Sequence, residues 1–164
     1  GMRSEIIEIG VAELDLATLA ITRTDSLLVR PQHSEVSEFC TELTSITAAD
    51  VAHAPTFPEA AAALAEKYQA QVAPWASWGN YDREMLKRMS ELHACPMPVS
   101  RRHLNAKTLY ALARGQVKEI GLARAVTNLG LPFEGRHHRG VDDARAVASI
   151  LRALLSNARA AWAK

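Results

Sequence analysis

The sequence lacks the features of secreted, membrane-spanning and zinc-stabilised proteins. It has two cysteines, Cys40 and Cys95, with no Cys-x-x-Cys and no Cys/His spacing typical of a structural zinc site. We therefore expect reduced core thiols and a cytoplasmic protein. No apolar run approaches the roughly 20 residues that span a bilayer, and no basic stretch with an apolar segment and cleavage site opens the chain. The sequence predicts no membrane association.

Neither sign of charge is in excess overall, but the charges are unevenly distributed. The formal net charge is +1, whereas residues 1–60 hold ten acidic and three basic side chains, and residues 101–139 hold eight basic side chains, three histidines and two glutamates. A basic half suits contact with a polyanion, although a solvated basic face is the commoner reason for such a pattern. The 164 residues, 48% of them hydrophobic, fit one domain over 1–164. We interpret Gly1 as a tag-removal remnant, so that Met2 starts the reading frame.

The pattern of apolar residues predicts an α/β domain. β-Branched runs over 5–14 and 19–29 indicate an antiparallel hairpin, and further strands are expected over 72–78 and 103–106. Helices are expected over 34–40, 47–51, 56–69, 82–93, 107–114, 117–129 and 142–162. A hairpin followed by strands that alternate with helices predicts a mixed β-sheet flanked by helices.

Two aspartates stand at the starts of predicted helices and share a face with apolar residues. Asp143 lies on the stripe of Val147 and Ile150, and Asp82 lies on the stripe of Leu86. Each aspartate alone is explained equally well by helix capping. Two inward carboxylates also suit a hard divalent cation, and two such ions about 3.5–4 Å apart can hold both reacting oxygens of a phosphodiester.

His138 lies on a glycine-containing loop five residues before Asp143. A neutral imidazole, with an ordinary pKa of about 6.5, can accept a proton from an attacking water at neutral pH. The simpler interpretation is a surface histidine in a loop, and we expect His137 to be such a residue.

These residues give the chain a resemblance to a known family. It resembles the DEDD 3′–5′ exonuclease superfamily, specifically the histidine-containing DEDDh branch (DnaQ/RNase T-like) and its Eri-type members, with an RNase H-like fold. Asn105-Ala-Lys107 gives weaker support. The segments that carry the match are Glu5-Ile-Ile-Glu-Ile-Gly10, Leu43-Thr-Ser-Ile-Thr47 with Ala54 and Phe57, Ser77-Trp-Gly-Asn-Tyr-Asp82, and Phe133-Glu-Gly-Arg-His-His-Arg-Gly-Val-Asp-Asp-Ala144.

The resemblance implies a function and a set of site residues. Asp82 and Asp143 match metal ligands, and His138 matches the general base. The family uses two Mg²⁺ or Mn²⁺ ions to hydrolyse phosphodiester bonds at single-stranded RNA or DNA 3′ ends. For the nucleic acid we expect phosphate contacts from basic residues and stacking of its bases on aromatic rings. The simpler interpretation is that the basic side chains are solvated and that the tryptophan is packed in the core. These substrate-contact candidates are Lys107, Arg136, Arg139, Trp78 and Tyr81.

The chain also departs from the family, whose first strand carries Asp-x-Glu. No such strand precedes residues 5–14, and Glu5 and Glu8 match the family's next strand instead. We therefore expect two of four carboxylates and impaired metal binding. The alternative is a non-catalytic relative that binds nucleic acid or a protein; a third interpretation is an unrelated α/β binding domain with coincidental motifs.

The strand that is expected to be missing is central in the related sheet. Its absence would expose backbone donors and acceptors on both sides of the gap. We expect the gap to be closed by rearranged pairing of the strand over 5–14, or by strand exchange with another copy of the chain in a homodimer.

Overall fold

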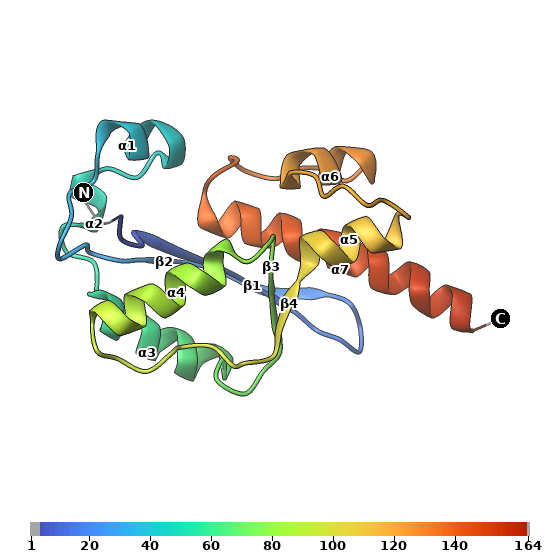
Figure 1. The fold of residues 1–164 in the computed structure, drawn as a ribbon, viewed down its shortest axis with the longest axis horizontal. Coiled ribbons are helices and arrows are strands. Elements are labelled where there is room, and N and C mark those ends of the chain that lie inside the picture. Colours follow the sequence, from blue (N-terminus) through green and yellow to red (C-terminus); the bar gives the residue numbers. More distant parts are fainter. Residues whose placement is uncertain (1–3, 164) are drawn as a thin grey trace.

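The computed structural model of the chain describes residues 4–163 (Figure 1). Within that range no helix has the length and apolar character needed to cross a membrane. The elements follow in the order β1 (Glu8–Leu14), β2 (Ile21–Leu28), α1 (Glu38–Thr44), α2 (Ala48–Val51), α3 (Phe57–Tyr68), β3 (Trp75–Ser77), α4 (Tyr81–Leu92), β4 (His103–Asn105), α5 (Ala106–Ala113), α6 (Leu122–Asn128) and α7 (Gly140–Trp162).

The strands form one antiparallel and one parallel pair, which confirms the predicted mixed α/β architecture. β1 and β2 are the predicted hairpin, with Gly10 opposite Ser26. β3 pairs with β4 in parallel, with Ser77 opposite Asn105. The two pairs are separate sheets, and over residues 4–163 β1 pairs with β2 alone. The expected rearranged pairing of the first strand is therefore not observed.

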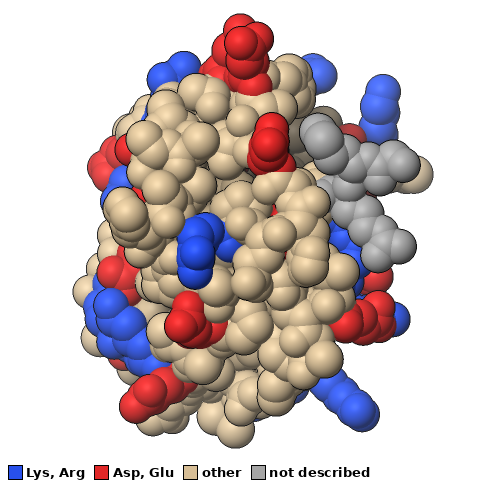
Figure 2. Space-filling model, turned by 90° about the vertical axis from the view of Figure 1, so that its left-hand side faces the viewer, with Lys and Arg blue, Asp and Glu red and all other residues tan. Residues whose placement is uncertain are grey.

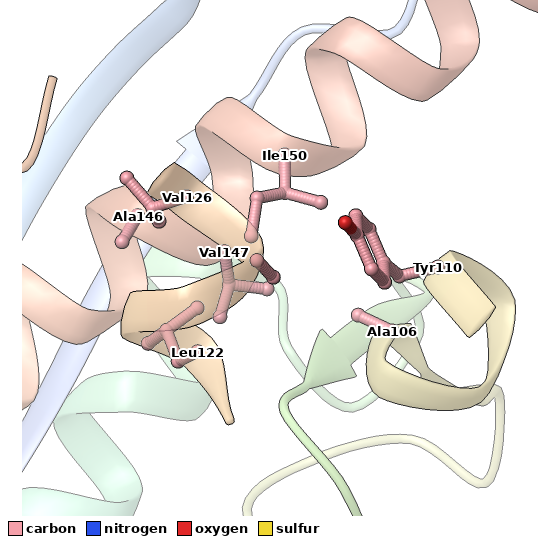
Figure 3. Packing of buried hydrophobic residues seen from close by; sticks show 8 residues of the cluster. Ala106, Tyr110, Leu122, Val126, Ala146, Val147 and Ile150 are labelled. Carbon is pink, nitrogen blue, oxygen red and sulfur yellow. The ribbon is translucent and has the colours of Figure 1, made fainter. Parts of the chain in front are cut away.

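Helix α7 joins the two strand pairs into one unit. It packs across β1 and β2 and also contacts β3, α5 and α6. One hydrophobic core lies between α5, α6 and α7, where the fully buried Tyr110 ring faces Ile150 and Ala106 (Figure 3). A second core lies between the strands and the helices α3 and α4, around Phe57 and Met89. Each pair of strands is thus covered by helices, as the alternating pattern predicts.

Helix α1 begins later than the sequence predicts. The helix expected over 34–40 begins at Glu38, after Ser37, whose hydroxyl accepts a hydrogen bond from the Cys40 amide at 3.2 Å. The preceding loop is bound to the buried carboxylate of Glu5, which accepts the backbone N–H of His33 at 2.6 Å and the hydroxyl of Ser34 at 3.0 Å. These long-range bonds hold the loop in a non-helical conformation.

Helix α6 is shorter than predicted, because residues 117–121 form a loop. The Glu119 carboxylate accepts a hydrogen bond from the Thr108 hydroxyl at 2.5 Å and lies 3.9 Å from the Lys107 ammonium, which fixes this loop on α5. The other elements lie within three residues of their predicted bounds. Cys40 and Cys95 are free, as expected; both are partly exposed, and Cys95 packs against the second hydrophobic core.

Candidate active site

The two neighbouring aspartates at the start of α7 have different partners. The Oδ1 atom of Asp143 lies 3.0 Å from the Nδ1 atom of His137 and 3.4 Å from the backbone nitrogen of His138. The first turn of α7 has no N-cap side-chain bond of its own from Arg139. Asp143 therefore faces the histidine loop, as the carboxylate of a site would.

Asp142 fixes the loop that carries the histidines. Its Oδ2 atom accepts the backbone N–H of Arg136 at 2.8 Å, and its Oδ1 atom lies 3.2 Å from the Nη1 atom of Arg145. Gly135 has a φ angle of +90°, and a Cβ atom there would lie 2.2 Å from the Asp142 carboxyl carbon. Only glycine tolerates both conditions, so the loop folds directly onto Asp142.

His138 has an unusual backbone and an unengaged ring. Its φ angle is +73°, a left-handed conformation that costs a non-glycine residue roughly 1–2 kcal/mol. Its ring lies 4.1 Å from that of His137 and makes no hydrogen bond within residues 4–163. The exposed imidazole of His138 is thus available to accept a proton.

His137 differs from the solvated loop residue that the sequence suggests. Besides its contact with Asp143, its ring packs edge-on against Phe133, with 5.4 Å between the centroids. Both histidines therefore lie at the start of α7, one with its ring and one with its backbone on the same carboxylate.

Asp82 lies in the first turn of α4, which the turn after β3 positions. The Ser77 hydroxyl donates to the carbonyl of Gly79 at 2.8 Å, and Gly79, with φ of +100°, reverses the chain so that α4 begins at Tyr81. Water reaches part of the Asp82 side chain, but the surrounding protein raises its pKa, and the negative charge of Asp143 raises it further. The charge of Asp143 thus disfavours the ionised form of Asp82, an effect that a bound cation would offset.

The carboxylates are of the type that binds divalent cations, but they are few. Among residues 4–163 no three histidine, cysteine, aspartate or glutamate side chains gather as they would around a metal ion. Asp82 and Asp143 supply hard oxygen ligands, of which such an ion uses about six, water included. Glu8 has another role, because its Oε2 atom accepts the backbone N–H of Gly140 at 2.8 Å and its Oε1 atom accepts the Ser26 hydroxyl at 2.6 Å.

The aromatic candidates for nucleic-acid contact differ in accessibility. Trp78 belongs to the first hydrophobic core, and its Nε1 atom donates to the carbonyl of Ile120 at 3.1 Å. Tyr81, in the turn of helix that holds Asp82, is 69% exposed. Of the two rings, that of Tyr81 is the one free to stack on a base.

The basic candidates are held to different degrees. Lys107 lies 3.9 Å from Glu119, and the Nε atom of Arg139 lies 3.4 Å from the Oε2 atom of Glu8, whereas the side chain of Arg136 is exposed. Figure 2 shows one side of the molecule, where basic and acidic side chains are interspersed rather than gathered in a band of one sign. On that side the basic residues form no continuous positive surface.

The approach of β1 to the start of α7 is a feature that sequence reasoning missed. A Cβ atom on Gly10 would lie 1.8 Å from the carbonyl carbon of Gly140. The absence of a side chain at both positions lets the two backbones touch, and Glu8 then receives the Gly140 amide. The paired glycines, one in each element, are the signal that could have found this contact.

Comparison with known proteins gives consistent results. The exonuclease (RNase T) family model matches residues 1–151. The chain is 30% identical over 168 residues to 3′-5′ exoribonuclease 1 of Homo sapiens, covering 93% of this chain and 47% of that protein. It is 29% identical over 161 residues to ERI1 exoribonuclease 3 of Mus musculus, covering 92% of this chain and 48% of that protein. The chain thus spans about half the length of these relatives.

Solved structures agree with this match. The nuclease domain of 3′hExo, a DEDDh family member bound to rAMP, superimposes with a TM-score of 0.80 at 26% identity and covers 93% of this chain and 82% of that one. A 3′-exonuclease in a structure of 3′-end specific recognition of histone mRNA stem-loop gives a TM-score of 0.84 at 27% identity, with 93% and 56% coverage. The fold is therefore that of RNase H-like exonuclease domains, and the chain belongs to the DEDDh 3′–5′ exonuclease family as an Eri-type member.

Proposed function

We propose that the site formed by Asp82, Asp143 and His138 hydrolyses phosphodiester bonds at the 3′ ends of single-stranded RNA or DNA. The observation that carries the proposal is the histidine loop bound to Asp143 at the start of α7, and the raising of the Asp82 pKa by the charge of Asp143 supports it. The relatives are named as 3′–5′ exoribonucleases, which favours RNA as the substrate.

The chemistry requires divalent cations, and Mg²⁺ or Mn²⁺ suits these ligands. Asp82 and Asp143 would hold them through carboxylate oxygens. A pair of such ions, when bound, supplies charge stabilisation for the attacking and leaving oxygens of the phosphodiester. The ring of His138 takes the proton from the attacking water, and the exposed ring of Tyr81 offers a surface on which the terminal base stacks.

Activity of residues 1–164 alone is expected to be weak. Two carboxylates hold a pair of ions less firmly than four, and the family's Asp-x-Glu strand has no counterpart among residues 4–163. A non-catalytic protein that binds nucleic acid or a protein partner through the same fold is the second candidate, and this scarcity of carboxylates favours it. The cytoplasmic location stays a prediction.

A strand from a second copy of the chain, in a homodimer with strand exchange, would complete the sheet. In the described residues β1 has one paired edge and one free edge, and so does β3. Free strand edges present unpaired backbone donors and acceptors that another strand can pair. Sedimentation at increasing protein concentration tests this: a dimer supports it, and a strictly monomeric species contradicts it.

A 3′-end trimming assay tests the proposed activity. Single-stranded RNA labelled at its 5′ end is incubated with Mn²⁺ and the protein, both as residues 1–164 and with the upstream codons of the source reading frame. We expect a ladder of shortened products that disappears with Asp82→Asn and with His138→Ala. Asp15→Asn is the matched control, because Asp15 lies in the exposed β1–β2 turn. If neither length of the protein trims the RNA, the exonuclease proposal is rejected and the non-catalytic binding function is favoured.

A further inference from the structure

A pocket of 340 Å³ lies between β2, the loop over 131–134 and α7, and none of Asp82, Asp143 and His138 lines it. Three arginines, three hydroxyl side chains and one glutamate form its polar lining. This lining comprises Thr22, Arg23, Thr24, Glu134, Arg145, Ser149 and Arg152.

The pocket follows from a polar stripe on α7. Arg145, Ser149 and Arg152 are spaced i, i+4 and i+7, so they share one face of the helix. The neighbouring stripe with Val147 and Ile150 is buried in the first hydrophobic core. Helix α7 therefore presents two guanidinium groups and a hydroxyl along one wall, opposite strand β2.

The three arginines differ in how far their charge is already neutralised. The Nη2 atom of Arg23 lies 2.6 Å from the Oε2 atom of Glu13. Arg145 is shared between Asp142, at 3.2 Å, and the hydroxyl of Thr24, at 3.3 Å. Within residues 4–163, Arg152 has neither a hydrogen bond nor an ion pair. One full positive charge and part of a second are thus available to an anion.

We propose that this pocket binds a small phosphate anion, either inorganic phosphate or the phosphate of a mononucleotide. The guanidinium groups of Arg145 and Arg152 hold its oxygens, and the hydroxyls of Thr24 and Ser149 donate further hydrogen bonds. Guanidinium groups bind phosphate through paired N–H donors. The volume lies at the lower end of the range for small-molecule sites, about 300–1,000 Å³.

The same pocket is connected to the histidine loop. Arg145 contacts one oxygen of Asp142, and the other oxygen accepts the backbone N–H of Arg136 at 2.8 Å. A phosphate on Arg145 competes with Asp142 for the guanidinium and alters the carboxylate that holds the loop before His138. Occupancy of the pocket is therefore sensed at the loop, whether or not the chain is catalytic.

Phosphate titration followed by NMR tests the proposal on the chain in EDTA, at neutral pH and constant ionic strength. We expect saturable shifts of residues around the pocket together with the backbone amide of Arg136. Arg152→Ala should weaken binding about tenfold, because it removes a guanidinium group whose hydrogen bonds to phosphate are charge-assisted. Arg124→Ala, which removes an exposed arginine of α6 outside the pocket, should bind like the parent.

Three further arms sharpen the result. Glu134→Gln should tighten binding, because it removes the carboxylate from the pocket lining. Tighter binding of adenosine 5′-monophosphate than of inorganic phosphate identifies a mononucleotide as the ligand, and equal binding identifies the phosphate group alone. Equal weakening by Arg152→Ala and Arg124→Ala, or shifts that never saturate, would overturn the proposal. This readout uses no hydrolysis, so it stands or falls separately from the exonuclease activity.

Discussion

Replacing Gly10 with alanine tests how closely β1 and the start of α7 are fitted together. The added Cβ would lie 1.8 Å from the carbonyl carbon of Gly140, 2.0 Å from its oxygen and 2.2 Å from the nitrogen of Val141. Carbon atoms in contact are about 3.5–4.0 Å apart, so the backbones must separate by about 1.7 Å. None of these atoms belongs to a flexible side chain, so the strain cannot be relieved by a rotamer change.

The expected loss of stability follows from two contributions. Overpacking of this kind costs about 1–3 kcal/mol. The separation also weakens the 2.8 Å bond from the Gly140 amide to the Glu8 carboxylate, and a hydrogen bond to a charged group contributes about 1.5–3 kcal/mol. Together these give about 4 kcal/mol, a large part of the roughly 5–15 kcal/mol by which a domain is stable. The corresponding fall in Tm is about 8–16 °C.

Denaturant unfolding followed by circular dichroism measures this loss, with two glycines as a graded control. At Gly121, with φ of −68°, an added Cβ meets nothing within 4 Å. At Gly140 it meets the Gly10 nitrogen at 3.0 Å and the Glu8 carboxyl group at 3.3 Å. We expect alanine to be nearly neutral at Gly121, moderately destabilising at Gly140 and most destabilising at Gly10. Equal stability of the Gly10 and Gly121 variants would refute the close fit of β1 and α7.

Three further changes have defined outcomes. Glu5→Gln should lower the free energy of unfolding by about 2 kcal/mol at neutral pH. Burial opposes the charge of Glu5, but the backbone amides of His33 and Gln32 outweigh burial and hold the pKa of Glu5 below 4.5. The difference in stability between parent and variant should therefore vanish as the pH falls through that lowered pKa. Asp82→Asn should raise Tm in metal-free buffer at neutral pH, because burial and Asp143 raise the pKa of Asp82, and this gain should shrink in acid as the parent becomes protonated. His138→Gly should raise the free energy of unfolding by about 1 kcal/mol, because glycine adopts the φ angle of +73° without strain. The same variant should lose trimming activity. A variant less stable than the parent would contradict this reasoning.

Local patterns predict most of the fold because they depend on neighbouring residues. The capping box that begins α3 is formed as expected, with the Glu59 carboxylate accepting the Thr56 amide at 2.7 Å. The sequence predicts the starts of α1 and α6 too early because their loops are held by residues of other elements, Glu5 before β1 and Thr108 in α5. A window of neighbouring residues carries no information on such bonds.

The candidate site is predictable in its members and less so in their orientation. The helical spacing of Asp82 and Asp143 with apolar residues predicts two inward carboxylates, whereas in the structure Asp82 is exposed and Asp143 is half-buried. Asp142 binds the loop backbone and Asp143 contacts the histidines, and this difference depends on how the loop folds back onto α7. The positive φ angle of Gly135 makes that fold possible. The contact of the His137 ring with Asp143 arises from that same fold and has no local sequence signal.

Paramagnetic broadening by Mn²⁺ tests the central claim, that Asp82 and Asp143 form one cation site beside His138. NMR spectra of the chain are recorded with increasing Mn²⁺, for the parent and for Asp82→Asn and Asp15→Asn. We predict that amides near Asp82, Asp143 and His138 broaden first, and that Asp82→Asn weakens this effect while Asp15→Asn leaves it unchanged. Broadening that spares the starts of α4 and α7, or that Asp82→Asn and Asp15→Asn alter equally, would contradict the account.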